Sequence, residues 1–263
     1  MNIKFRPIAN LLSDKRKKIS IDEGGRIDLD SKIILEKPEF ASVVNSIQHL
    51  MFSQFHSDKQ LVGNFIELGA GALPMKKLYK QIKSTDIVES PHLDGVLDAT
   101  NLDLPDSSVD GIFLQNTFHH IPDPVAFFDE ANRVLKQNGK VVIVDPYWNF
   151  FSSMLYPRLF RTESYDKTGT WNDASTDPMI GANQALSYIV FQRDLAIFER
   201  NVTNLSIEAM VPLRSGLRYF LTGGLNFRKL LPSRFFPFLA KVENRIPLLD
   251  KVAIHWMVVL VKI

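Results

Sequence analysis

The sequence predicts an α/β fold built on a doubly wound, mostly parallel sheet of seven strands. Short, nearly continuous apolar runs alternate with helical stretches through the middle of the chain, a pattern typical of parallel strands buried on both faces. Hydrophobic and charged residues make up 45% and 23% of the 263 residues, which is ordinary for a globular domain with insertions. The expected strands cover residues 64–68, 86–89, 95–98, 111–115, 140–145, 203–213 and 253–262.

The totals exclude several kinds of function. Because the chain has no cysteine, it carries no disulfide, thiolate zinc site or cysteine nucleophile. A net charge of +2 gives no reason to expect a nucleic-acid partner. No apolar run approaches the roughly 20 residues that span a bilayer, and the N-terminal residues lack the apolar core of a signal peptide. We expect a cytoplasmic protein, whose oligomeric state the sequence leaves open.

Helices are expected between the strands. Apolar side chains at helical spacing predict one helix over residues 39–57 and another from about Pro74 to Lys83. A third helix carries Phe127 and Val134 among its apolar positions and is expected to stop at Asn138-Gly139, a typical C-terminal signal.

A glycine loop follows the first expected strand, in the sequence Glu67-Leu68-Gly69-Ala70-Gly71. Gly69 permits a tight turn, and Gly71 lets the backbone approach a ligand without a Cβ atom in the way. Glu89 ends the next expected strand, where a carboxylate can accept both ribose hydroxyls of a nucleoside. Alternatively, Glu89 or Ser90 only caps the turn.

These motifs together resemble the class I methyltransferases, particularly the methyltransferase type 11 group. The resemblance rests on ELGAG (67–71), the acidic Glu89, DATNLDLPDSSVD (98–110), LQNTFHHIPDP (114–124) and EANRVLKQNGKVVIVDP (130–146), which run in the family's order. It implies a Rossmann-like methyltransferase fold and S-adenosylmethionine as the cofactor. The residues that it implies for the cofactor are Glu67, Gly69, Ala70, Gly71, Glu89, Asp98, Ala99, Gln115 and Asn116.

The sequence departs from the family pattern in two places. Leu73 stands where the family often has a third glycine, and only residues 90–94 separate the second and third expected strands, where a helix is usual. The segment around Asn183 further resembles a subgroup found among bacterial surface-polysaccharide and secondary-metabolite genes.

The chain divides into four segments on this interpretation. The third is rich in aromatic and polar residues and is longer than an ordinary connection, as lids are. The segments are an N-terminal extension (1–38), a cofactor-binding core (39–147), a lid or substrate insertion (148–200) and the last strands of the sheet with an amphipathic helical insertion (201–263).

Methyl transfer from a sulfonium needs an oriented acceptor and exclusion of water. If the acceptor is a hydroxyl, a base helps to remove its proton. His119 and His120 follow the fourth expected strand, and Asp145 follows the fifth, so we expect these three as catalytic candidates. The histidines could equally only pack near the cofactor, and Asp145 could cap a turn. No cluster has metal-ligand spacing, so no metal is expected.

Candidate acceptor contacts lie after residue 146. Tyr147, Trp171 and Asn183 combine aromatic and amide side chains that suit sugars or glycolipids, although aromatic rings in such a segment also form cores. Residues 217–240 combine Phe with Arg and Lys, which suits peripheral contact at the inner face of a membrane. The alternative is a helical hairpin that packs on the sheet with its basic residues in solvent.

The sequence therefore predicts a methyltransferase that moves a methyl group from S-adenosylmethionine to a small-molecule, glycan or lipid-linked acceptor, on oxygen. Two alternatives stay open. One is a cofactor-binding partner of a biosynthetic complex with little or no turnover. The other is an NAD-dependent oxidoreductase, against which Pro74 speaks because it stands where the third dinucleotide-loop glycine would be.

Overall fold

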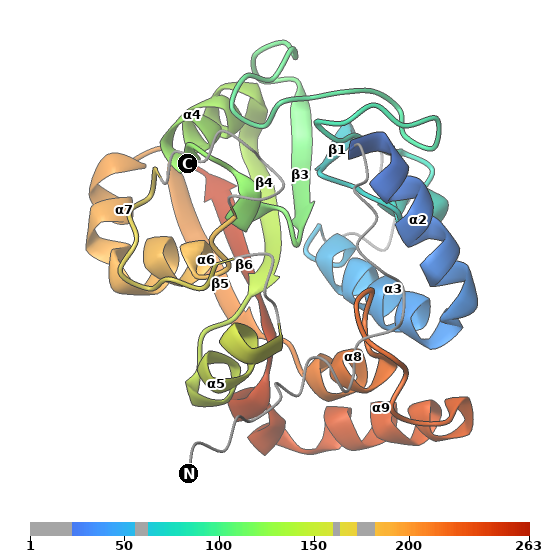
Figure 1. Cartoon of the computed structure of the whole chain (residues 1–263). Helices are drawn as coiled ribbons and strands as arrows, with labels where there is room; N and C mark the ends of the chain where they lie inside the picture. Colours follow the sequence, from blue (N-terminus) through green and yellow to red (C-terminus); the bar gives the residue numbers. More distant parts are fainter. Residues whose placement is uncertain (1–22, 56–62, 160–163, 173–181) are drawn as a thin grey trace.

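The computed structural model describes residues 23–55, 63–159, 164–172 and 182–263 (Figure 1). Its centre is a six-stranded sheet in the order β2-β1-β3-β4-β6-β5. Strands β1 to β4 pair in parallel, and β6 runs antiparallel to both of its neighbours. The predicted α/β class and mostly parallel sheet are thus confirmed. The strands are β1 (Phe65–Leu68), β2 (Ile82–Ser84), β3 (Val109–Gln115), β4 (Leu135–Pro146), β5 (Leu205–Pro212) and β6 (His255–Lys262).

The described part of the sheet has six strands rather than seven. The segment expected as the third strand, residues 95–98, makes a single parallel bridge between Val96 and Asp86. Parallel neighbours need a crossover of a dozen or more residues that covers the sheet face. Only ten residues separate Ser84 from Gly95, and half of Val96 stays exposed. The short connection therefore leaves an isolated bridge in place of a strand.

The region after the glycine loop also differs from expectation. The helix expected over residues 74–83 is reduced to the single 3₁₀ turn η1 (Met75–Lys77), and β2 occupies residues 82–84 in place of 86–89. Seven residues lie between Pro74 and Ile82, too few for both a helix and its exit turn. As a result, Asp86 rather than Glu89 comes directly after the end of the strand.

Helices cover both faces of the sheet, with α4, α6 and α7 on one side and α2 and α3 on the other (Figure 1). Helix α2 lies in the N-terminal extension, where no helix was predicted from the sequence. None of the helices in the described ranges is long and apolar enough to cross a membrane. The helices are α2 (Glu23–Glu36), α3 (Pro38–Phe52), α4 (Pro124–Val134), α5 (Phe150–Leu159), α6 (Leu186–Tyr188), α7 (Leu195–Asn201), α8 (Gly216–Thr222) and α9 (Phe236–Arg245), with shorter turns η2 (Phe118–His120), η3 (Ile189–Arg193), η4 (Ser233–Phe235) and η5 (Pro247–Val252).

Helix α4 shows how local sequence sets an element. Pro124 occupies its first turn, and the Asp123 carboxylate accepts hydrogen bonds from the N–H groups of Val125 and Ala126. The helix ends at Val134, four residues before the expected stop signal, because β4 already begins at Leu135. Asn138, with φ of +63°, makes a turn within that strand instead.

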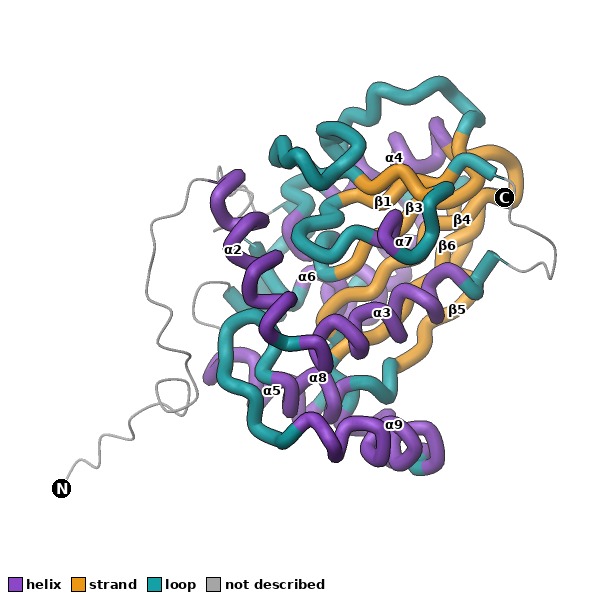
Figure 2. The backbone as a smooth tube through the Cα atoms, turned by 90° about the vertical axis from the view of Figure 1, so that its right-hand side faces the viewer, coloured by secondary structure: helices purple, strands orange, loops and turns teal. Residues whose placement is uncertain are grey.

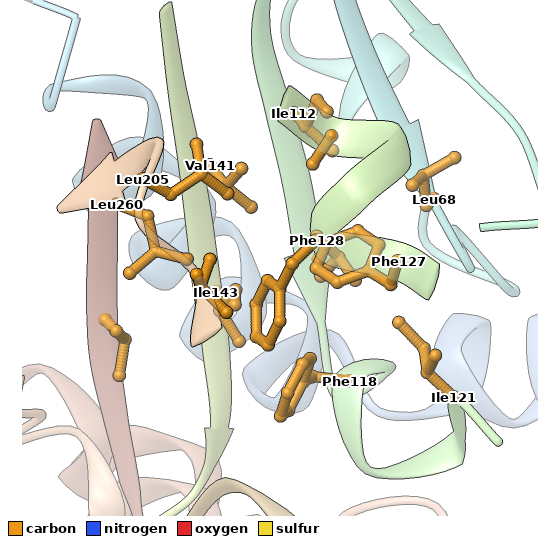
Figure 3. Close-up of a cluster of buried hydrophobic side chains, with 14 of the residues drawn as sticks. Leu68, Ile112, Phe118, Ile121, Phe127, Phe128, Val141, Ile143, Leu205 and Leu260 are labelled. Atoms are coloured by element: carbon orange, nitrogen blue, oxygen red, sulfur yellow. The ribbon is translucent and has the colours of Figure 1, made fainter. Parts of the chain in front are cut away.

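Successive strand residues point to opposite faces, and both faces are apolar. On one face, Phe127 and Phe128 of α4 pack against Ile112, Val141 and Ile143 of the sheet (Figure 3). The alternate residues of the same strands pack against α3 on the other face. This two-sided burial leaves the carboxyl ends of the strands as the place where polar groups gather.

Candidate cofactor and acceptor site

A cavity of about 440 Å³ opens at the carboxyl ends of β1 and β3, a volume typical of small-molecule sites. The glycine loop and the segments that follow β2 and β3 form one part of its wall. Helices α2 and α3, together with Tyr219 and Leu225, form another part. Segments that are far apart in the sequence therefore share one site.

The glycine loop needs glycine at two positions for different reasons. Gly69 and Gly71 have φ of +65° and +53°, in the left-handed region that favours glycine. A Cβ atom on Gly69 would overlap the side chain of Thr117, whereas one on Gly71 would meet no atom within 4 Å. Gly71 thus leaves an open cradle in the cavity wall, as a loop that approaches a ligand with its backbone requires.

Asp86 supplies the carboxylate next to this loop. Its Oδ2 atom accepts a hydrogen bond of 3.0 Å from the N–H group of Gly71, and its side chain lines the cavity. Glu89 is exposed and is not among the cavity-lining residues. Asp86 therefore replaces Glu89 as the candidate for the expected ribose contact, because β2 ends five residues earlier than expected.

Glu67 stabilises the glycine loop through hydrogen bonds. It is buried, and its Oε2 atom accepts hydrogen bonds from Met75 N–H at 2.8 Å and from the Ser84 hydroxyl at 2.6 Å. Burial raises the pKa of Glu67 to about 8, although the two hydrogen bonds act in the opposite direction. The carboxyl is therefore largely protonated at neutral pH and links β1, η1 and β2 as a neutral group.

Asp98 and Ala99 line the cavity, as expected from the sequence. The Oδ1 atom of Asp98 accepts hydrogen bonds from both the N–H and the hydroxyl of Thr100, which sets the turn. The loop beyond is held to α4, since Glu130 accepts from Leu102 N–H and Arg133 donates to the carbonyls of residues 102 and 104. Glu130 and Arg133, both in the EANRVLK stretch, thus position this loop.

Gln115 and Asn116 also line the cavity. Asn116 has φ of +53°, a conformation that asparagine tolerates better than most residues. The Thr117 hydroxyl donates to Gly69 O at 3.1 Å, which ties this segment to the glycine loop. The turn after β3 and the loop after β1 therefore form one unit.

The two histidines have different positions. His120 lines the cavity, whereas His119 is buried behind it with Nδ1 2.8 Å from Asp145 Oδ1. The two imidazole rings lie 4.3 Å apart between centroids. Of the three predicted catalytic residues, only His120 can meet a ligand in this cavity, while His119 and Asp145 form a buried pair that supports it.

A third buried histidine, which the sequence did not single out, lies near this pair. His255 pairs with Pro146 across the β4–β6 ladder and packs against the ring of Tyr219. Burial, with a smaller effect of His119, lowers the pKa of His255 to about 3, so its imidazole is neutral.

The predicted acceptor residues Tyr147, Trp171 and Asn183 do not line the cavity. Tyr147 packs on Trp256, and the Trp171 indole N–H donates to Asp194 at 3.0 Å. Asn183 is buried. Its side-chain oxygen accepts hydrogen bonds from the N–H groups of Asp166 and Ala185, and its side-chain nitrogen donates to Asp166 O. Tyr147 and Trp171 therefore pack against the core on the α4 face of the sheet, which was the alternative considered for the aromatic segment.

The other end of the cavity is apolar and is formed by α2 and α3, which the sequence did not indicate as part of a site, together with Tyr219 and Leu225 of the segment 217–240. We call it the apolar lobe, and it consists of Ile27, Ile34, Phe40, Val44, Tyr219 and Leu225. Ile27, Asp30 and Ile34 follow one another at helical spacing on α2, so Asp30 places a carboxylate at this otherwise apolar end. No group of three or more metal-ligand side chains occurs among the described residues.

Comparison with known proteins is consistent with this geometry. Residues 69–143 match the family described as a methyltransferase domain. The chain carries a class I methyltransferase domain. The match begins in the glycine loop and ends within β4, so it includes the acid-bearing loops and the paired histidines. No curated protein matches the chain.

One of the solved structures that the chain resembles shares its fold at a TM-score above 0.5. Geranyl diphosphate C-methyltransferase from Streptomyces coelicolor is 12% identical, with a TM-score of 0.51 over 83% of this chain and 76% of that one. Phosphoethanolamine N-methyltransferase 2 from Haemonchus contortus is 12% identical over 82% and 52%, with a TM-score of 0.45. A methyltransferase from Aquifex aeolicus is 15% identical over 82% and 89%, with a TM-score of 0.41.

The predicted enzyme class and cofactor are confirmed at this level: the domain is that of an S-adenosylmethionine-dependent methyltransferase. The residues fit this cofactor, since an open glycine cradle, the Asp86 carboxylate and the Asp98 turn surround one cavity. The cofactor supplies an electrophilic methyl group on a sulfonium, and the protein needs to orient the acceptor and exclude water.

Proposed function

We propose that this enzyme transfers a methyl group from S-adenosylmethionine to a hydroxyl on an acceptor with an apolar body, either a small molecule or a lipid-linked one. The observation that carries the proposal is the division of one cavity into a polar half, with Gly71, Asp86 and Asp98, and the apolar lobe. A bare sugar is a poorer fit, because its hydroxyls would face apolar side chains without hydrogen-bond partners.

Oxygen is the proposed acceptor atom because a base is available. A hydroxyl loses its proton during methylation, and histidine is a side chain suited to accepting it. His120 lines the cavity, and the buried His119–Asp145 pair lies behind it. We assign His120 to proton removal and His119 with Asp145 to positioning its ring.

The glycine loop, Asp86 and Asp98 would hold the cofactor. Asp86 accepts hydrogen bonds from Gly71 N–H at 3.0 Å and from Val88 N–H at 3.3 Å, and each carboxylate oxygen keeps a lone pair for a ribose hydroxyl. Glu67, protonated at neutral pH, keeps the loop in place. The peripheral membrane contact predicted for residues 217–240 remains part of the proposal.

Turnover with isotope-labelled cofactor tests the function. Cofactor carrying a ¹³C methyl group is incubated with a long-chain alcohol, a prenylated phenol, phenol and a monosaccharide, and the products are examined by NMR. We expect methyl ethers of the apolar acceptors and little reaction with the monosaccharide. Methylation of the sugar in preference to the other acceptors would contradict the apolar acceptor.

The same spectra identify the methylated atom when amine analogues are added. Methyl groups found only on nitrogen would contradict the oxygen assignment and would point to Asp30, the carboxylate of the apolar lobe, as the acceptor contact. Calorimetric binding of S-adenosylmethionine without turnover on any acceptor would favour the alternative of a cofactor-binding partner protein.

A further inference from the structure

The outer side of α9 carries exposed aromatic and basic side chains. Phe235 and Phe238 are 41% and 65% exposed. Positions 238, 241 and 245 share one side of a helix, so Phe238, Lys241 and Arg245 form a stripe, which Phe235 extends by one turn. We call these four residues the α9 outer face.

The opposite side of α9 fixes the orientation of the helix. Phe236 is buried, and Glu243 is completely buried in an ion pair with Arg218 of α8. The Arg218 N–H also donates to Glu243 at 2.7 Å. Because this inner side is anchored to the body, the aromatic rings of the outer face are held in solvent by the fold itself.

The α9 outer face is positively charged. Exposed basic residues of the same region include Arg228 and Lys251. The acids of this region are paired with basic side chains: Glu243 with Arg218, Asp250 with Arg214 and Glu39 with Lys229. The Arg234 guanidinium also lies over the Phe235 ring, 5.0 Å from its centroid. Aromatic rings among unneutralised Lys and Arg are typical of surfaces that lie in the headgroup layer of anionic membranes.

More exposed apolar side chains lie on neighbouring elements. Leu248 of η5 is 65% exposed, and Phe150 of α5 is 82% exposed. The turn η5 contacts both α5 and α9, and α5, α8 and α9 gather at one end of the molecule in both views (Figures 1 and 2). Exposed apolar side chains that gather on neighbouring elements at one end of a molecule favour an interaction site there.

We propose that the α9 outer face docks on the surface of a bilayer that contains anionic lipid. A second copy of the chain is a poorer occupant, because self-association through this face would bring like charges together. Helix α8, which anchors α9, also supplies Tyr219 to the apolar lobe. Docking would therefore bring the acceptor end of the cavity to the membrane, a consequence that rests on the proposed function.

Sedimentation of the full chain with lipid vesicles tests the docking. The vesicles contain phosphatidylcholine alone or phosphatidylcholine mixed with phosphatidylglycerol, each at low and high salt. We expect binding to the mixed vesicles that weakens with salt, and weak binding to the neutral ones. Two double variants, Phe235→Ser with Phe238→Ser and Lys241→Glu with Arg245→Glu, should each bind about tenfold more weakly or worse.

Matched variants elsewhere serve as controls. Ile197→Ser removes a half-exposed apolar side chain of α7, and Lys80→Glu with Arg200→Glu makes the same change in net charge at two other exposed positions. Both should bind vesicles as the wild type does. All variants should bind S-adenosylmethionine normally, which separates a docking failure from a failure of the proposed function.

Equal binding to both kinds of vesicle, or an equal loss in the controls, would overturn the proposal. So would absence of vesicle binding by the wild type together with a dimer, seen by analytical ultracentrifugation, that Phe238→Ser dissociates. That last result would assign the α9 outer face to a second copy of the chain.

Discussion

The carboxylate of Asp86 lies 3.0 Å from the backbone nitrogen of Gly71, so the acid after β2 and the glycine loop after β1 are joined directly. The bond holds Asp86 at the cavity wall, whereas Glu89 does not line the cavity. A charged acceptor that is oriented in this way is suited to a neutral diol such as ribose.

Replacing Asp86 should weaken cofactor binding selectively. Loss of a hydrogen bond to a charged group costs about 1.5–3 kcal/mol, so we expect Asp86→Asn to raise the Kd for S-adenosylmethionine by at least about tenfold. Asparagine can still accept from Gly71 N–H, so the loop should keep its shape. Isothermal titration calorimetry measures the effect, and Glu89→Gln is the matched control, expected to bind normally. A larger loss in Glu89→Gln would restore the sequence-based assignment.

The two glycines of the loop should respond differently to alanine. Gly69→Ala brings a Cβ atom against Thr117 as well as a left-handed φ, so we expect the free energy of unfolding to fall by about 2–4 kcal/mol. Gly71→Ala has only the backbone cost of about 1 kcal/mol, but it fills the cradle and should weaken cofactor binding. Urea unfolding and calorimetry separate the two effects. Equal stability of both variants would contradict the packing argument.

Glu67 should make stability depend on pH. Its pKa is about 8 in the folded protein and 4.5 in the unfolded chain, so the unfolded state loses this proton first as pH rises. The free energy of unfolding then falls with pH in this window. The glutamine of Glu67→Gln cannot titrate. Between pH 6 and 8, the free energy of unfolding of the wild type should therefore fall by about 2 kcal/mol relative to that of the variant.

Urea unfolding of both proteins at several pH values measures this difference. Because all other titrating groups are shared, their contributions cancel. A difference that stays constant across the window would mean that Glu67 is ionised in the folded protein.

The apolar lobe should control acceptor binding. Ile34 lines the cavity, whereas its neighbour Leu35 is 82% exposed on the same helix. We expect Ile34→Ala to raise the KM for apolar acceptors by about tenfold, with the cofactor Kd unchanged. Leu35→Ala makes the same chemical change outside the cavity and should leave KM as it is. A similar KM for both variants would place the acceptor elsewhere.

The histidines should affect turnover rather than cofactor binding. His120→Gln should lower kcat for a hydroxyl acceptor by about 100-fold or more. Asp145→Asn weakens the pairing with His119 and should lower kcat less, while changing the pH profile. Both variants should bind S-adenosylmethionine normally. Unchanged kcat in His120→Gln would favour the packing role that the sequence also allowed.

Much of the polar half of the site could be predicted from the sequence. The residues of the glycine loop, Asp98, Asn116 and His120 were all singled out and all line the cavity. The glycine loop follows β1, and Asn116 and His120 follow β3, so they meet where the carboxyl ends of parallel strands share one edge. Local sequence patterns are therefore enough to predict that such residues lie close together.

The carboxylate beside the glycine loop could not be assigned in this way. A run such as Asp86-Ile87-Val88-Glu89 suits a strand by composition, but the paired strand is Ile82–Ser84. Pairing with β1 determines the strand end, and a displacement of a few residues exchanges one acid for another. The buried pair of His119 with Asp145 also depends on the distance between β3 and β4 in the sheet.

The sequence by itself determined the fold class, the cofactor and the loops that approach it, because these depend on short-range periodicity and on glycine at defined positions. Only the tertiary structure decided which side chains form the apolar lobe, the proposed acceptor end of the cavity. The apolar lobe combines residues from α2, α3 and α8, nearly 200 positions apart in the chain, while the predicted Tyr147, Trp171 and Asn183 pack into the body. Apolar side chains look alike in a sequence whether they fill a core or line a cavity, and the difference arises only when distant helices enclose a space.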